Sequence, residues 1–190
     1  MNNMSTDEDY KKLATAACNN DLDTVKVMVD AGFDKESIDQ FEEPILSEIV
    51  FNLLEDAVPE RYAIVKSLIN IGFNPQHLDS DRCGPLTQAM LSMDTMMLEV
   101  LLQGGAIANE TAGFKEGETL YDWAVFDYIH QVWEINKIPE EPSQEALADE
   151  DAWLIWLDAM ALKYERRRPD HLLLLRKYGA KTGIELKKMH

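Results

Sequence analysis

The chain has 190 residues, 46% of them hydrophobic, so it can bury a real core without disulfides or a structural metal. Its formal net charge of −17 would repel nucleic acid and anionic membranes, which we exclude as partners, and would attract a basic protein. No window approaches the roughly 18 apolar residues of a membrane span, and the start MNNMSTDEDYKK carries no targeting pattern, so we expect a cytoplasmic protein.

Along the chain, four apolar helical runs each end in a glycine. They read VKVMVDAGFD at 25–34, VKSLINIGFN at 65–74, LEVLLQGGAI at 98–107 and LLLLRKYGAK at 172–181. In the first three runs, the apolar residues recur at helical spacing. A glycine after the last turn can take the left-handed conformation that stops a helix. We therefore predict a helix before each of Gly32, Gly72, Gly105 and Gly179.

A second, shorter helical segment precedes each of these runs. The four segments read KKLATAACNN at 11–20, EPILSEIVFN at 43–52, GPLTQAMLSM at 84–93 and GETLYDWAVF at 117–126. Their small residues permit close packing of helices. The pattern therefore predicts helix pairs, in which the glycine-ended helix is the outer member. The interval from Gly105 to Gly179 is roughly twice the interval from Gly72 to Gly105, so it has room for two units and some insertion.

The stretches GPLTQAM, EPILSEI and GETLYDWA resemble the T-P-L-H-x-A opening of the ankyrin repeat, whose period is about 33 residues. The end LLRKYGAKTGIEL resembles the last repeat of many ankyrin proteins. The resemblance covers most of residues 10–185. It implies an all-α, ankyrin-like solenoid of about four helix-pair repeats in one domain, 1–190. The repeats would span about 10–42, 43–83, 84–116 and 117–185.

Three segments depart from that pattern. Residues 53–60 lengthen the first helix or loop of repeat two, and residues 107–118 lengthen a finger, which is the loop that leads from one helix pair into the next. Residues 127–169 form an insertion within repeat four. In the insertion, INKIPEEPSQEALADED reads as an acidic loop and AWLIWLDAMALKYERRR as an amphipathic helix. Its apolar face would consist of Trp153, Leu154, Leu157, Met160 and Ala161. Pro169 is expected to start the next helix. Insertions in such arrays map to one face, often the binding face.

The charge is unevenly placed along the chain. Residues 1–160 hold 32 acidic residues and nine lysines or arginines, whereas residues 161–190 hold three and nine. Many of the acids fall in the expected fingers and inner helices, Glu42 and Glu43 among them. An acidic face of this kind would raise the encounter rate with a basic partner, although acidity can also serve solubility alone.

The phrase GF(D/N) occurs twice, at Gly32 and Gly72. The ankyrin pattern places a small residue and then Asp or Asn after the glycine, and the Asp or Asn orders the turn. Asp34 and Asn74 match this pattern, and Asn109 is a further candidate. Phe33 and Phe73 replace the small residue, and two roles stay open for them: filling space between repeats, or anchoring a partner.

The motifs of catalysis are missing, so we expect no enzyme and no cofactor. The sequence has no G-x-S-x-G, phosphate loop or G-x-G-x-x-G. HLDSDRCGP at 77–85 places Asp79, Asp81 and Gly84 at calcium-loop positions, but Met90 stands where a glutamate is needed. No histidine stands at helical spacing from another histidine or a cysteine, so no metal is expected.

Several single residues receive structural interpretations. Cys18 and Cys83 are expected to be reduced structural thiols. His171, at the start of a leucine-rich helix, is expected to be a cap or surface residue. Met93 and Met96 fall where a repeat usually exposes its side chains, and they either belong to a contact surface or fill gaps between repeats.

The candidate partner-binding residues are acids and aromatic side chains of the expected fingers and inner helices. They are Phe33, Asp34, Glu36, Asp39, Phe73, Asp79, Asp81, Glu110, Phe114, Glu116, Glu118 and Trp123. An acidic field would steer association, and the aromatic side chains would be buried on binding.

The resemblance implies a non-catalytic protein-binding module, monomeric when free. By analogy with small acidic inhibitors, we expect it to inhibit or escort a basic partner, as an immunity or antitoxin-like protein does for a secreted toxin. Two alternatives stay open. One is a scaffold or regulatory adaptor that uses the acidic array for one cellular protein and the basic carboxy-terminal segment for another. The other is an acidic mimic of nucleic acid. The partner, organism, oligomeric state and conformation of residues 127–169 are left open.

Overall fold

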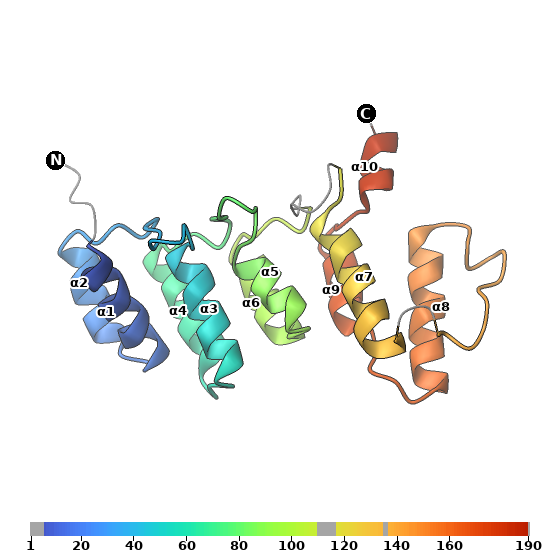
Figure 1. Ribbon diagram of the computed structural model, residues 1–190, viewed down its shortest axis with the longest axis horizontal. Helices are drawn as coiled ribbons and strands as arrows, with labels where there is room; N and C mark the ends of the chain where they lie inside the picture. The colour runs from blue at the N-terminus through green and yellow to red at the C-terminus, as the bar shows by residue number, and fades with distance from the viewer. Residues whose placement is uncertain (1–5, 110–116, 135–136, 190) are drawn as a thin grey trace. The chain divides into compact units, whose positions relative to one another are not determined.

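A computed structural model describes residues 6–109, 117–134 and 137–189 of the chain. Within these ranges the protein is all-helical, with ten α-helices and no β-strand (Figure 1). The all-α prediction is thus confirmed. No helix in the described ranges combines the length and apolar character needed to cross a membrane. The chain divides into two compact units, Met1–Ile107 and Ala108–His190, called unit 1 and unit 2 below.

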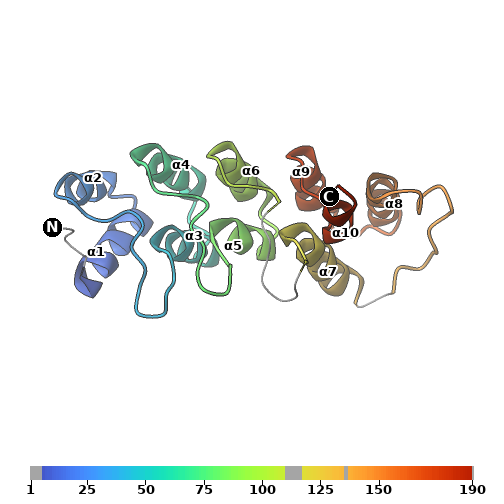
Figure 2. The same ribbon diagram turned by 90° about the horizontal axis from the view of Figure 1, so that it is seen from above.

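Unit 1 is built from three helix pairs in two layers (Figure 2). Helices α1, α3 and α5 form one layer and pack on one another in chain order, while α2, α4 and α6 form the other. The helices are α1 (Asp7–Cys18), α2 (Leu22–Asp30), α3 (Ile45–Glu55), α4 (Arg61–Ile71), α5 (Pro85–Leu91) and α6 (Thr95–Gln103). The lengthening predicted for residues 53–60 lies partly in α3, which is longer than its counterpart α5.

The core of unit 1 repeats from pair to pair. Leu46, Ile49, Val50 and Leu53 are buried in or beside α3, and the equivalent residues of the next pair, Leu86, Ala89, Met90 and Met93, are buried in or beside α5. Met93 lies in the turn after α5, with φ of +50°, and is only 3% exposed, so it fills space in the core. Met96 is 60% exposed and lies on the surface.

The outer helices of unit 1 end as predicted. The backbone φ is +101° at Gly32, +104° at Gly72 and +106° at Gly105, in the left-handed region that stops a helix. Asp34 and Asn74 then order the following turns, accepting the N–H groups of Glu36 and Gln76 at 3.0 and 2.9 Å. A side chain at position 72 would also meet the Lys35 ammonium.

Unit 2 contains α7 (Leu120–Trp133), α8 (Glu150–Lys163), α9 (Asp170–Lys177) and α10 (Gly183–Lys188), with α9 packed against both α7 and α8. The helix predicted within residues 127–169 is α8, but it also exposes Ile155 and Leu162, so it is less amphipathic than predicted. Leu154, Leu157, Met160 and Ala161 are buried, as predicted, and Trp153 is half-buried. Pro169 stands immediately before α9, also as predicted.

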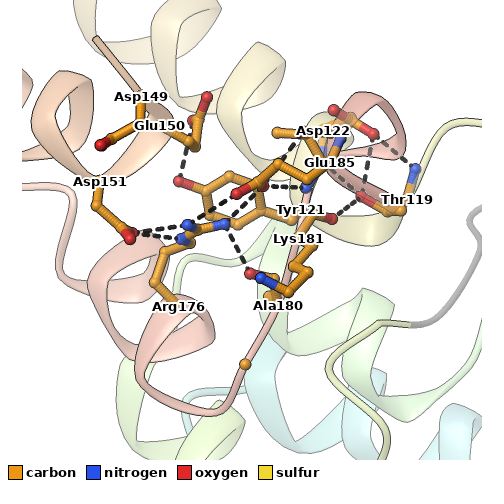
Figure 3. A network of polar contacts seen from close by, with 12 residues as sticks. Thr119, Tyr121, Asp122, Asp149, Glu150, Asp151, Arg176, Ala180, Lys181 and Glu185 are labelled. Carbon is orange, nitrogen blue, oxygen red and sulfur yellow. Dashed lines mark hydrogen bonds and ion pairs between the residues drawn. The ribbon is translucent and has the colours of Figure 1, made fainter. Parts of the chain in front are cut away.

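Arg176 of α9 joins three helices of unit 2 through one guanidinium (Figure 3). It is bonded to Glu185 of α10 at 2.7 Å and to Asp151 of α8 at 2.7 Å, and it stacks 5.4 Å from the centre of the Tyr121 ring. The side chain is only 12% exposed. Burial works against the charged form, but the hydrogen bonds to Glu185 and Asp151 raise the Arg176 pKa above its ordinary value.

A second group of hydrogen bonds in the same view joins the first turns of α7 and α10 (Figure 3). The Asp122 carboxylate accepts the backbone N–H groups of Thr119 and Gly183, each at 2.8 Å. The Thr119 hydroxyl donates to the Lys181 carbonyl at 2.8 Å. Asn109, expected to order its own turn, accepts the Lys181 N–H at 2.8 Å. The segment between α9 and α10 is therefore held from both sides.

The surface position predicted for His171 is wrong. The side chain is 2% exposed, and its ring lies 5.6 Å from that of Tyr128. The reason is that α9 is flanked by α7 and α8, so residues of its first turn face the core. Burial, followed by the nearby Arg167 charge, lowers the His171 pKa from 6.5 to about 4.

The buried imidazole makes stability depend on pH. Between about 6.5 and 4 the unfolded chain binds a proton at His171 that the folded chain excludes, so stability falls as pH falls through this window. At 1.36 kcal/mol per pKa unit, the loss is about 3 kcal/mol. We expect urea unfolding of His171→Leu at pH 4 and pH 7 to show a pH dependence smaller by that amount. His130→Gln, which alters an exposed histidine, should keep the wild-type dependence; equal slopes for all three proteins would contradict this account.

The Arg176 network should dominate the polar stability of unit 2. Arg176→Gln leaves the partly buried Glu185 without its cation, so we expect the free energy of unfolding to fall by about 3 kcal/mol. Arg168→Gln is the matched control, since Arg168 is 45% exposed and pairs with Asp158 outside this network; its loss should stay below about 1 kcal/mol. Similar losses for both variants in urea titrations would refute a special role for Arg176.

Candidate protein-binding surface

Two equivalent loops of unit 1 form short hairpins, which we call finger 1 (residues 33–44) and finger 2 (residues 73–84). In finger 1 the Asp39 N–H donates to the Glu43 carbonyl at 3.0 Å, and in finger 2 the Asp79 N–H donates to the Cys83 carbonyl at 2.8 Å. The backbone of each hairpin turns through one residue with positive φ, Glu42 at 66° and Arg82 at 63°. The repeat that relates α3 to α5 thus extends from the helices to the loops.

Two of the predicted binding acids hold these hairpins together. The Asp39 carboxylate accepts the N–H groups of Phe41 and Glu43, both at 2.8 Å, and the Asp79 carboxylate accepts that of Cys83 at 2.8 Å. Hydrogen bonds of this kind order a turn through its own side chain. Asp39 and Asp79 therefore have a structural role, and each still places a negative charge on its finger.

The fingers and α3 bring together an acidic cluster, which consists of Asp39, Glu43, Glu48 and Asp79. Burial raises the pKa of the half-buried Glu43, and the charges of Asp79, Asp39 and Glu48 raise it further. The Tyr10 hydroxyl donates to the Glu43 carbonyl at 3.0 Å and thereby links α1 to finger 1. Each of these charges disfavours the ionised form of Glu43, and a basic side chain of a partner near them would relieve that repulsion.

A groove of about 260 Å³ lies between α1 and α3, beside the acidic cluster. Its lining includes Cys18, Glu48, Asn52 and Asp56. Burial, and then the charges of Glu48 and Asp56, raise the Cys18 pKa to about 11, so the thiol stays protonated and unreactive at neutral pH. Both Cys18 and Cys83 are thiols outside any disulfide.

Large apolar side chains are exposed next to these acids. Phe51 of α3 is 47% exposed, and Leu91, at the equivalent position of the neighbouring α5, is 36% exposed. Phe51 stands three residues after Glu48, so both lie on the same face of α3. Phe41 in finger 1 is 79% exposed. Unit 1 thus places apolar and acidic side chains on the same helix and finger.

The predicted candidates in finger 1 differ in how much they are exposed. Asp34 and Glu36 are exposed, and the Glu36 carboxylate lies 3.1 Å from His77 Nδ1 of finger 2. Phe33 is half-buried. It follows α2, which packs against α1 and α4 at one end of the outer layer, whereas the equivalent Phe73 follows a helix with neighbours on both sides.

Phe73 must be removed from the predicted surface. It is 1% exposed, because it follows α4, which packs between α2 and α6. Of the two roles left open for it, filling space between helix pairs is the one that its burial supports. Asp81, in the same finger, is exposed.

The remaining candidates belong to unit 2 or lie outside the described ranges. Glu118 and Trp123 are half-buried in unit 2, the second within α7. Glu110, Phe114 and Glu116 fall in a segment outside the described residues. The acidic cluster therefore contains only two of the twelve predicted residues, Asp39 and Asp79.

Glu48, Phe51 and Leu91 were not singled out from the sequence. The signal that could have found Phe51 is helical spacing: Leu46, Ile49, Val50 and Leu53 mark the buried face of α3, which leaves Phe51 off that face, and the register between α3 and α5 then points to Leu91. Glu43 was counted among the acids of the expected fingers but not among the binding residues.

Metal-binding groups do not converge in the part of the chain that the structure describes. There, no three side chains of histidine, cysteine, aspartate or glutamate lie close enough to hold an ion. In the stretch that resembles a calcium loop, the Asp79 carboxylate is bonded to the backbone of its own hairpin.

No protein-family model matches the chain, and no curated protein matches it. The resemblance to the ankyrin repeat therefore depends on the residues and the geometry of the chain itself.

Proposed function

We propose that this chain is an ankyrin-type array of helix pairs that binds a basic protein without catalysis. Three features support the array: helices in pairs, outer helices that end in a left-handed glycine, and a hairpin finger that recurs in successive pairs. The observation that carries the binding role is the acidic cluster of Asp39, Glu43, Glu48 and Asp79 beside the exposed Phe51.

The charge supports a basic partner for unit 1. Residues 1–107 hold 19 acidic residues and seven lysines or arginines, while residues 108–190 hold 16 and 11. Unit 1 thus carries a net charge of −12 and unit 2 of −5. Such a field raises the association rate of a cationic partner and is weakened by salt. Burial of Phe51, Leu91 and Phe41 against the partner would slow the dissociation of the complex.

Inhibition or escort of a basic protein, such as a secreted toxin, is the role that we propose for this binding. It rests on analogy with small acidic inhibitors. The adaptor alternative needs the basic carboxy-terminal segment as a second docking surface. Three cations of that segment, Lys163, Arg168 and Arg176, already form ion pairs with acids of unit 2, which weakens this alternative.

The binding face can be tested with matched double variants as baits in native lysate at low salt. We expect the wild-type chain to capture a protein of basic isoelectric point. For that purified protein, Glu48→Gln/Phe51→Ala should raise the Kd by about 100-fold, since loss of a central aromatic and its neighbouring charge costs on the order of 3 kcal/mol. Salt should lower the association rate.

The control is Glu99→Gln/Met96→Ala on α6. It removes the same charge and an exposed apolar side chain three residues away from it, as in the test pair, but from the outer layer. Its Kd should match that of the wild type. An acidic captured partner, or equal weakening by both double variants, would refute the proposed face. Competition by duplex DNA would instead favour a mimic of nucleic acid.

A further inference from the structure

Unit 2 has its own groove, of about 530 Å³, between α7, the segment before α8, α8 and α10. Its volume falls in the range of about 300–1,000 Å³ that is typical of ligand pockets. Every lining residue belongs to unit 2. The groove is separate from the acidic cluster of unit 1.

Apolar side chains form much of the groove. Leu147 is 55% exposed and Ile184 is 68% exposed, while Val125 and Trp153 are half-buried. Aliphatic side chains as open as Leu147 and Ile184 gain free energy when an apolar group covers them, by about 25 cal/mol for each Å² removed from water. The groove therefore favours a ligand with at least one large apolar group.

The polar lining of the groove is almost entirely anionic. It contains the carboxylates of Asp122, Asp149, Glu150 and Glu185, and a single ammonium, that of Lys188. Anionic lipids, phosphates and nucleic acid are disfavoured here by the same charges. A cationic ligand is favoured.

These carboxylates are fixed before any ligand arrives, as Figure 3 shows for most of them. Asp149 accepts the Ala152 N–H at the start of α8 at 2.8 Å, and Asp122 accepts the Gly183 N–H at 2.8 Å. Glu150 accepts the Tyr121 hydroxyl at 3.2 Å, and Glu185 is bonded to Arg176. Asp149 and Glu150 keep lone pairs beyond these bonds, so they can accept a further cation without rearrangement, whereas Glu185 already accepts four hydrogen bonds from Arg176 and Thr182.

We propose that this groove binds a basic amphipathic segment of a protein. A large apolar side chain of that segment lies against Leu147, Trp153 and Ile184, and lysines or arginines next to it lie against the carboxylates. Charge complementarity and the open aliphatic walls select this occupant. The inference deepens the proposed function, on which it rests for the basic character of the partner, and it adds a second contact on unit 2.

The test uses a short fluorescein-labelled peptide, long enough for about three helical turns and made of lysine and leucine with the leucines at helical spacing. We expect it to bind the full-length chain in fluorescence anisotropy. Ile184→Lys should raise the Kd by on the order of tenfold, because it removes apolar contact and adds a cation in the groove. Leu147→Lys should do the same, and it serves as a second variant should Ile184→Lys alter folding.

Ile155→Lys is the matched control, because Ile155 is also 68% exposed, lies on α8 and does not line the groove. It changes the net charge equally and should leave the Kd unchanged. A lysine and serine peptide of the same charge should bind much more weakly than the leucine peptide. An equal loss of affinity in Ile155→Lys and Ile184→Lys, or equal binding of the two peptides, would overturn the proposal that the groove binds a basic amphipathic segment.

Failure of the groove can be told from failure of the proposed function. If Glu48→Gln/Phe51→Ala weakens binding of the leucine peptide and the groove variants do not, the groove is refuted while the acidic face of unit 1 stands. If no variant matters, or the wild type does not bind the peptide, the groove is refuted, and the bait experiment alone decides the proposed function.

Discussion

The structure of unit 1 depends on one constraint: a pair of short helices cannot bury its apolar face alone. Burial therefore comes from stacking one pair on the next. The effect is visible in the outer layer, where α4 has neighbours on both sides and buries Ile64, Val65 and Leu68, whereas α2, at the end of the stack, buries only Val25. Terminal position alone does not set the amount, since α6, at the other end of this layer of unit 1, buries Met97, Leu98, Leu101 and Leu102.

Because of the same constraint, the residues that form the core differ from those available to bind a partner. Because the stack supplies the core, the finger tips and the free face of α3 are left for charged and exposed apolar residues. Asp39 and Asp79 combine both tasks, since each carboxylate closes its own hairpin and contributes charge to the acidic cluster. An acidic residue in a finger is thus no proof of binding. Glu48 and Phe51 lie on a helix and not in a turn, so they give the stronger argument for a binding surface.

What the sequence predicted well was local. The left-handed glycines, the paired helices and the helix α8 each follow from residues within about one or two helical turns. What it predicted poorly depends on neighbours far along the chain. Phe33 and Phe73 stand in the same local phrase, yet only Phe73 is fully buried. His171 is buried because α9 lies between α7 and α8, and the groove of unit 2 requires four separate segments to meet.

The start of α8 explains why unit 2 combines an acidic groove with basic residues. Asp149 caps this helix and Glu150 and Asp151 lie in its first turn, where carboxylates are favourable. Asp151 binds Arg176 of α9, which also holds Glu185 of α10. Arg176 thus joins helices of unit 2. Asp149 and Glu150, at the same end of α8, line the groove instead, so this helix start contributes carboxylates both to the pairing inside the unit and to the groove.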